Sequence, residues 1–266
     1  MPERHNAAPS PSQKTPELPH STHVLRVCAL YPDLMNIYAD RGNLLVLERR
    51  CAWRGIDFTL TACGLGEALD GAAHDLFYLG GGQDRDQQLC AEDLLRHKRQ
   101  GLHDAAARGA VVLGVCGGYQ LLGSSYGLGH EELAGVGLVD VRTVRPEGGP
   151  RLIGNVAIEV QLEDGGLTRV LAGFENHGGR TQLGDGQRPL GRVLRGHGND
   201  GRSGFEGARR GNVIGTYLHG PLLPKNTWFA DWLIATALGL DVDALAPLDD
   251  ALEQQAHLGA RRAAGV

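Results

Sequence analysis

The stretch AVVLGVCGGYQLLG, residues 110–123, decides how the rest of the chain is interpreted. Ala110–Val115 is a short apolar run of the kind that forms a buried strand. Gly114–Gly118 then reads G-x-C-x-G, which is the cysteine version of the nucleophile elbow. The residues that follow, up to about Gly127, favour a helix. We therefore predict a strand, a sharp turn that carries Cys116, and a helix.

The elbow gives Cys116 the surroundings of a nucleophile. Small neighbours permit strained backbone angles at the turn, and ligands bind at the carboxyl edge of such sheets. A helix N-terminus lowers a cysteine pKa from ~8.5 towards ~3.5–7.5, so we expect a reactive thiolate. The amide of Gly117 points into the same space and can bind an oxyanion. The alternative is a buried, inert thiol, which is our interpretation of the other four cysteines, Cys28, Cys51, Cys63 and Cys90.

Strands and helices alternate on the N-terminal side of the elbow. The strands are expected at Val24–Leu30, Phe58–Thr61 and Asp75–Leu79, and the helices at Leu44–Arg54 and from Asp84 to about Arg108. This alternation predicts βαβ units, and therefore an α/β fold with a doubly wound, mostly parallel sheet.

The pattern changes after Gly135 to a β-rich, antiparallel extension. Val156–Leu162 alternates apolar and polar residues, as a half-exposed antiparallel strand does. Asn212–Leu218 returns to a buried strand, Trp228–Leu238 is an amphipathic helix, and a last helix is expected after about Leu248. The predicted domains are a disordered tail (1–22), one α/β domain with a β-rich insertion (23–240) and a helical C-terminal tail (241–266).

Two further motifs follow predicted strands and should meet Cys116 at one edge of the sheet. His219 follows the buried strand that ends at Leu218, so it is the first candidate for the base that a cysteine nucleophile needs. His177, in FENHGG, is the second candidate. Gly80–Gly82 follows the strand DLFYL and lets backbone amides approach a ligand closely.

Composition narrows the class of protein. Forty of the 266 residues are glycine, about 15%, roughly twice the usual ~7%. The net charge of -5 and the 5% of aromatic residues argue against a nucleic-acid surface. An odd number of cysteines without a CxxC spacing fits neither a disulfide framework nor a zinc site. The N-terminus has no apolar signal-peptide core and no apolar run is long enough to span a membrane. We expect a cytoplasmic protein that is not a transmembrane protein.

The combined motifs resemble those of a known family. GVCGGYQLLG and GTYLHGP are similar to the motifs of class I, triad-type glutamine amidotransferase domains, with a flavodoxin-like fold, in the cobyric acid synthase-like branch. YPDLMNIYADRGN, LGGGQDRDQ, RLIGN and FENHGGRT resemble the GatD family, the glutaminase subunits of lipid II isoglutaminyl synthase. The resemblance runs from about Val24 to Leu238.

The resemblance implies glutamine hydrolysis, which the residues already support. Cys116 would attack the side-chain carboxamide of glutamine, and His219 would take the thiol proton and later protonate the ammonia. Gly117 and Gly82 would hold the oxyanion. Arg151 in RLIGN would bind the substrate carboxylate, as a guanidinium does well. Gln120 is also implied in substrate binding.

The resemblance also implies a partner. In these proteins a MurT-like Mur ligase subunit uses the ammonia to amidate the α-carboxyl of D-glutamate in the lipid II stem peptide, so a heterodimer is expected. No G-K-[ST] occurs in the chain, so we expect no cofactor here, with ATP and Mg on the partner ligase. His219-Gly220-Pro221 lacks the acid that follows two residues after the histidine in triad enzymes. We hypothesise that an acidic residue of the partner completes the site.

Three alternatives stay open. The chain could serve a different acceptor, as cobyric acid synthase-like domains do. It could be another cysteine hydrolase on the same fold, such as a peptidase-like protein. It could also be a non-catalytic subunit that only stabilises a ligase, which the presence of both Cys116 and His219 disfavours.

Overall fold

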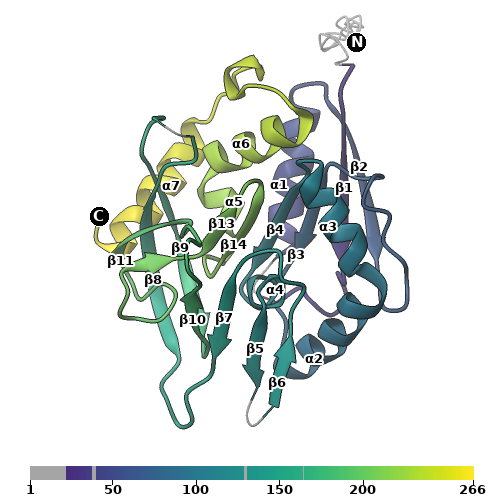
Figure 1. The fold of residues 1–266 in the computed structure, drawn as a ribbon. Coiled ribbons are helices and arrows are strands. Elements are labelled where there is room, and N and C mark those ends of the chain that lie inside the picture. Colours follow the sequence, from purple (N-terminus) through teal and green to yellow (C-terminus); the bar gives the residue numbers. More distant parts are fainter. Residues whose placement is uncertain (1–21, 38–39, 129–130, 164) are drawn as a thin grey trace, which may run out of the picture.

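The computed structural model describes residues 22–37, 40–128, 131–163 and 165–266. Its central element is a six-stranded sheet with the order β13-β14-β4-β3-β1-β2 (Figure 1). The strands are β1 (Val24–Leu30), β2 (Asp57–Cys63), β3 (Leu76–Leu79), β4 (Val111–Val115), β13 (Ala208–Arg210) and β14 (Val213–Thr216). All neighbours pair in parallel except β13 with β14. The predicted mostly parallel α/β sheet is therefore confirmed.

Helices cover both faces of this sheet. They are α1 (Arg41–Ala52), α2 (Asp84–Asp93), the π-helical turn η1 (Leu94–Lys98), α3 (Arg99–Ala107), α4 (Gly117–Leu122), α5 (Leu222–Lys225), α6 (Thr227–Leu238), the 3-10 turn η2 (Val242–Ala244) and α7 (Ala251–Ala264). The connection from β1 to β2 steps towards one edge, and the connection from β3 to β4 steps towards the other. Right-handed crossovers consequently place α1 and α3 on opposite faces. This is the doubly wound arrangement.

The middle strands form the core because both of their faces are covered. Every residue of β3, β4 and β14 is buried. This explains why they are continuous apolar runs without polar alternation. The strands end in register, since Leu79 pairs with Gly114 and Val115 with Thr216. The segments that follow β3, β4 and β14 therefore begin next to one another at the carboxyl edge.

The β-rich part forms two antiparallel-dominated sheets beside this edge (Figure 1). One has the order β10-β7-β5-β6, with β5 (Ser125–Leu128), β6 (Glu131–Ala134), β7 (Val141–Val144) and β10 (Arg180–Leu183). The other has the order β12-β11-β8-β9, with β8 (Leu152–Val160), β9 (Arg169–His177), β11 (Gly191–Arg195) and β12 (Phe205–Glu206). The expected antiparallel extension is confirmed.

The predicted helix from the elbow to Gly127 is wrong in its second half. Helix α4 ends at Leu122, and Gly123 has an extended backbone with ψ -175°. The amide of Ser124 donates to the carbonyl of Val141 at 2.8 Å instead of to the helix. From Ser125 the chain forms β5, which pairs with β6. Tertiary hydrogen bonding thus overrides a local sequence that favours a helix.

A buried arginine joins the C-terminal segment to the sheet helices. Arg50 of α1 is 1% exposed and donates to both Asp231 of α6, at 2.6 Å, and Asp250 before α7, at 2.7 and 2.8 Å. Arg54 binds Asp231 as well, at 2.8 and 2.9 Å. Three parts of the chain that lie far apart in sequence meet in this cluster.

A second buried charge cluster lies at the junction of α2 and η1, away from the elbow. Asp93 accepts hydrogen bonds from the Tyr31 hydroxyl and the Gly66 amide, both at 2.6 Å, and pairs with Lys98. Lys98 is fully buried and also donates to the Glu67 carbonyl at 2.9 Å. Across the described ranges no helix is long and apolar enough to cross a membrane.

Candidate active site

Cys116 has the strained backbone that the elbow motif predicts. Its φ is 53° and its ψ is -107°, a region that residues with a side chain rarely adopt. The Cys116 amide donates to the Thr216 carbonyl at 2.8 Å, which ties the turn to the end of β14. Strain of this kind persists only where the surrounding structure enforces it, and it concentrates at functional sites.

The two glycines after Cys116 are required by close packing against the end of β3. A Cβ atom on Gly118 would lie 2.1 Å from the Leu79 carbonyl oxygen, and one on Gly117 would lie 3.0 Å from the Gly82 amide nitrogen. The Gly118 amide also donates to the Gly80 carbonyl at 2.9 Å. The cysteine turn and the Gly80–Gly82 loop are therefore held against each other by their backbones.

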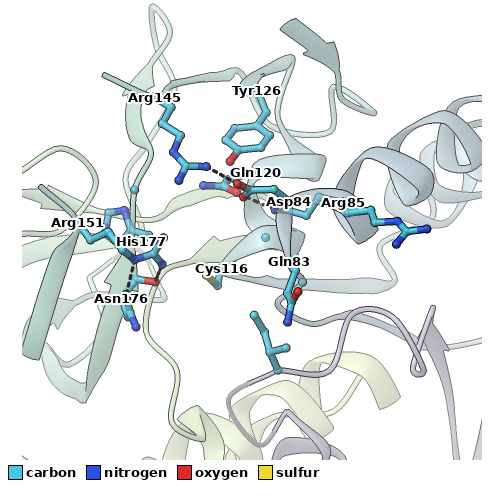
Figure 2. A pocket seen from close by; sticks show the side chains of 15 residues that line it. Gln83, Asp84, Arg85, Cys116, Gln120, Tyr126, Arg145, Arg151, Asn176 and His177 are labelled. Carbon is cyan, nitrogen blue, oxygen red and sulfur yellow. Dashed lines mark hydrogen bonds and ion pairs between the residues drawn. The ribbon is translucent and has the colours of Figure 1, made fainter. Parts of the chain in front are cut away.

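A cavity of about 400 Å³ opens beside Cys116 (Figure 2). Its walls come from the loop after β3 and the start of α2, from the elbow, and from the β-rich sheets. The lining residues are Ile37, Gly82, Gln83, Asp84, Arg85, Gln87, Cys116, Gly117, Gln120, Tyr126, Arg145, Arg151, Asn176, His177 and Gly178. Figure 2 shows Arg151, Asn176 and His177 on one side of Cys116 and the start of α2 on the other. The volume suits a small polar molecule.

Gly82 and Gly117 are the expected oxyanion donors, and the structure brings them together. Their backbones are in close contact, and the Gly117 amide forms a hydrogen bond to the Cys116 thiol. The amide of Gly81 has a different partner, because it donates to the buried carboxylate of Asp40 at 3.0 Å. Of the three glycines after β3, Gly82 lines the cavity together with Cys116.

His219 comes three residues after Thr216, which holds the Cys116 amide, but it does not line the cavity. It follows β14, and it pairs with Phe174 of β9 through two backbone hydrogen bonds of 2.9 and 3.1 Å. The Phe174 ring packs edge-on against the imidazole, at 5.8 Å between ring centroids. Burial, together with the nearby cations Lys225 and Arg151, lowers the pKa of His219 to about 4. The imidazole is therefore neutral at pH 7, as a general base must be.

His177, the second candidate base, is a wall residue of the cavity. Its ring stacks on the Tyr217 ring at 3.6 Å, and Nδ1 lies 2.9 Å from the Gly179 carbonyl oxygen. Burial, followed by the charges of Arg180, His219 and Arg151, lowers its pKa to about 3 against that hydrogen bond. The ring is held between fixed partners, so its position favours a structural role.

Arg151 lines the cavity, as expected for a group that binds a carboxylate. Its Nε donates to the Asn176 side-chain oxygen at 2.7 Å, and Nη2 donates to the Asn176 carbonyl at 2.8 Å. Asn176 thus orients the guanidinium from β9. The side chain is otherwise exposed, so it can turn to an incoming ligand.

Gln120 also lines the cavity, but its amide already has partners in the protein. Gln120 accepts from Gln87 at 2.8 Å and donates to the Tyr217 hydroxyl at 3.1 Å. The chain of hydrogen bonds continues from Tyr217 to Thr181 at 2.6 Å. A direct role of Gln120 in substrate binding stays a prediction.

The expectation of a low thiol pKa is wrong for the chain as it stands. Burial is the largest effect and raises the pKa of Cys116 to about 12, and the carboxylate of Asp40 raises it further. The Gly117 hydrogen bond and the charge of Arg151 oppose this shift but are smaller. The six-residue helix α4 does not outweigh desolvation. The resting thiol is protonated, so a base must take its proton during the reaction.

Some lining residues were not found from the sequence. Arg145 pairs with Asp84 across the cavity, joining the segment after β7 to α2 (Figure 2). Tyr126 lines the same side from β5, in a segment interpreted as helix. LGGGQDRDQ did signal Asp84, but nothing near Arg145 resembles a motif. Within the described part of the chain no group of histidine, cysteine or acidic side chains could hold a metal ion.

The fold and the site define a class. A strained cysteine at a strand-to-helix turn, a glycine loop packed against it and a histidine after the neighbouring strand are the features expected of an α/β acyl-transfer enzyme with a cysteine nucleophile. The model of the CobB/CobQ-like glutamine amidotransferase domain matches residues 26–227. The chain belongs to this family and, within it, to the GatD subunits of the glutamine-hydrolysing lipid II isoglutaminyl synthases.

Relatives in three bacteria support the assignment. The chain is 37% identical to the GatD subunit from Streptococcus pneumoniae, over 87% of this chain and 88% of the relative. It is 37% identical to the GatD subunit from Staphylococcus aureus, over 81% and 85% respectively. A cobyric acid synthase from Pelotomaculum thermopropionicum is 42% identical, but over 44% of this chain and 24% of the relative.

A solved structure supports the fold alone. PurLQS from Thermotoga maritima superposes with a TM-score of 0.54 and 23% identity, covering 73% of this chain and 87% of that chain.

Proposed function

We propose that this chain hydrolyses L-glutamine at Cys116 and delivers the ammonia to an ATP-dependent, MurT-like ligase subunit. The ligase amidates the α-carboxyl of D-glutamate in the lipid II stem peptide. One observation carries the proposal: the strained Cys116 opens into a small polar cavity that it shares with Gly82, Gly117 and Arg151. Family membership supplies the reaction class, and the names of the GatD relatives supply lipid II as the acceptor.

The proposed reaction uses residues from four segments: the elbow, the glycine loop after β3, the segment after β14 and the segment before β8. Cys116 Sγ attacks the carboxamide carbon while His219 accepts the thiol proton, and the amides of Gly82 and Gly117 stabilise the oxyanion. His219 then protonates the leaving nitrogen, which departs as ammonia and leaves a glutamyl thioester. Water adds to the thioester and releases glutamate and the thiol. Arg151 binds the α-carboxylate and sets the distance of the carboxamide from Cys116.

The sequence after His219 supports a partner that completes the site, because His219-Gly220-Pro221 has no acid two residues after the histidine, where triad enzymes carry one. A carboxylate at the imidazole would raise the pKa of His219 and orient the ring, as the acid of a catalytic triad does. We expect the ligase subunit to contribute this acid. Glutamine hydrolysis by the isolated chain should accordingly be slower than hydrolysis by the complex.

ATP and Mg²⁺ belong to the ligase in this proposal, because amide formation from a carboxylate requires activation. The heterodimer would act in the cytoplasm, at the inner face of the membrane where lipid II is presented. The cobyric acid synthase relatives make a different acceptor the second candidate. In that case the same glutaminase chemistry would serve another ligase.

The test uses the complex with the ligase subunit and glutamine labelled with ¹⁵N in the side chain. Wild-type complex with ATP and lipid II should transfer the label to lipid II, which mass spectrometry detects. Cys116→Ala should abolish transfer from glutamine, yet keep amidation when ammonium chloride is supplied, because the ligase stays intact.

Each alternative gives a different result. Glutamine-dependent amidation that survives Cys116→Ala would make the chain a non-catalytic, stabilising subunit. Glutaminase activity that depends on Cys116 but transfers no label to lipid II in the wild-type complex would support a different acceptor. Hydrolysis of peptides with no release of ammonia from glutamine would indicate a peptidase-like hydrolase.

A further inference from the structure

A chain of buried hydrogen bonds runs behind the glycine loop and is not used by the reaction scheme above. Asp40 is 2% exposed, and both of its carboxylate oxygens accept hydrogen bonds. Oδ2 accepts from the Gly81 amide at 3.0 Å, and Oδ1 accepts from the Tyr78 hydroxyl at 2.7 Å. Tyr78 accepts from Asn43 at 2.8 Å, and Asn43 accepts from the Leu223 amide at 2.8 Å.

This chain connects two parts of the site. One end holds Gly81, between the two other glycines of the loop. The other end holds Leu223 in α5, four residues after His219. The Gly81 carbonyl accepts from Ile37 at 3.2 Å, so both peptide groups of Gly81 are bound to the segment before α1. The loop is consequently fixed at Gly81 by the segment before α1.

The direction of the hydrogen bonds favours a carboxylate at position 40. Tyr78 uses its oxygen to accept from Asn43 and its proton to donate to Asp40. An asparagine could accept from the Gly81 amide through its side-chain oxygen. Its NH₂ group would then face the Tyr78 hydroxyl, so the hydroxyl proton would lose its acceptor. Asp40 satisfies both neighbours at once.

The carboxylate has an electrostatic cost at this place. Burial raises the pKa of Asp40 itself to about 6, and its charge contributes to the raised pKa of Cys116. A Cβ atom on Gly81 would lie 3.6 Å from Asp40 Oδ2 and 3.5 Å from the Cys116 Cβ. A negative charge so close to the nucleophile opposes thiolate formation. The hydrogen bond from the Gly81 amide gives the Asp40 carboxylate a geometric role that explains its presence near the nucleophile.

We infer that Asp40 is a positioning residue for the oxyanion hole. It binds the Gly81 amide so that the next amide, that of Gly82, faces the cavity beside Gly117. Through Tyr78 and Asn43 it also fixes this loop relative to the segment that carries His219. The inference rests on the proposed roles of Cys116, Gly82 and Gly117. It goes beyond them because Asp40 contacts neither the substrate nor the reacting atoms.

The test compares Asp40 with Asp93, a matched control. Asp93 is also buried and also accepts from a tyrosine hydroxyl and a glycine amide, but it lies away from the elbow. Asp40→Ala should lower kcat for glutamine hydrolysis about 10- to 100-fold, less than the roughly 100- to 1000-fold loss when an oxyanion donor is removed outright, with KM changed less than about threefold. Asp93→Ala should lower the melting temperature and leave kcat unchanged.

Asp40→Asn separates geometry from charge and guards against a variant that does not fold. It keeps an acceptor for Gly81, so it should recover most of the kcat that Asp40→Ala loses. Because it removes a negative charge, it should also move the alkylation of Cys116 by iodoacetamide to lower pH. This shift reports the charge of Asp40 near the nucleophile, whereas the recovered kcat reports the geometry of the loop.

The outcomes distinguish the inference from the proposed function. A kcat of Asp40→Ala equal to that of Asp93→Ala, or an effect on KM alone, overturns the positioning role. Activity that survives Cys116→Ala overturns the proposed site itself. If Cys116→Ala is inactive while Asp40→Ala is fully active, only the inference fails.

Discussion

Gly118 offers the most direct test of how the elbow is packed. An alanine Cβ at this position would lie 2.1 Å from the Leu79 carbonyl oxygen and 2.9 Å from the Gly80 oxygen. Real Cβ atoms essentially never approach closer than 3.0 Å, so α4 and the end of β3 must separate by about 0.9 Å. Both obstacles are backbone atoms, so no side-chain rotation can relieve the contact.

The separation would move Cys116 and Gly117 relative to Gly82. A misplacement of about 1 Å between reacting groups costs about 100-fold in rate, which corresponds to roughly 2.7 kcal/mol in the activation free energy. We therefore expect Gly118→Ala to lower kcat for glutamine hydrolysis about 100-fold. The assay is glutamate release at saturating glutamine, with the folded fraction measured by circular dichroism.

Gly259 is the matched control, because it too is a glycine inside a helix. A Cβ atom there meets no atom within 4 Å. Gly259→Ala should leave kcat unchanged and stabilise the chain by about 0.8–1.0 kcal/mol through helix propensity. If Gly118→Ala keeps a kcat within threefold of the wild type, the close packing of the elbow on β3 does not set the catalytic geometry, and the reasoning is refuted.

Three further predictions concern the charges of the molecule. Arg50→Ala should cost about 3 kcal/mol of unfolding free energy, because it removes a buried guanidinium and leaves the half-buried carboxylate of Asp250 unpaired, while Asp231 keeps Arg54. Loss of the exposed pair of Arg192 should cost less than about 1 kcal/mol. Equal melting temperatures for the two variants would contradict this. The acid limb of the pH profile of kcat/KM should lie near pH 4, where His219 gains a proton. Lys225→Met should move this limb to higher pH, because it removes a cation that lowers the pKa of His219. A wild-type limb near pH 6.5 would show that burial does not lower the pKa of this histidine. At pH 8, iodoacetamide should alkylate Cys116 roughly 1000-fold more slowly than a free cysteine of pKa ~8.5, as followed by mass spectrometry; alkylation at the rate of a free thiol would disprove the raised pKa.

The sequence was most informative where short-range patterns determine the structure. The apolar run before Cys116 and the glycines around it predicted the strand, the turn and the strained residue, all of which the structure shows. The position of His219 followed from the buried strand before it and from the rule that parallel strands end at one edge. Both inferences need only local pattern and a topological rule.

The remaining features depend on contacts between distant segments. No pattern in residues 169–177 predicts that Phe174 pairs with His219. Nor does the sequence around Arg145 predict its ion pair with Asp84. The early end of α4 depends on Val141, which lies beyond the helix-like stretch. The raised pKa of Cys116 follows from burial, which a motif does not report, and from Asp40, a residue that the sequence reading did not single out.

The Arg50 cluster has a consequence for where the folding unit ends. The family model stops at residue 227, and the domain boundary predicted from the sequence lies at 240. Asp250, one of the two carboxylates that neutralise Arg50, lies past both positions. A protein truncated at 240 would keep the sequence motifs and the nucleophile, but would leave Arg50 with half of its counter-charge. The segment that the family model matches and the segment that the chain needs to fold have different boundaries here, and the second extends at least to residue 250.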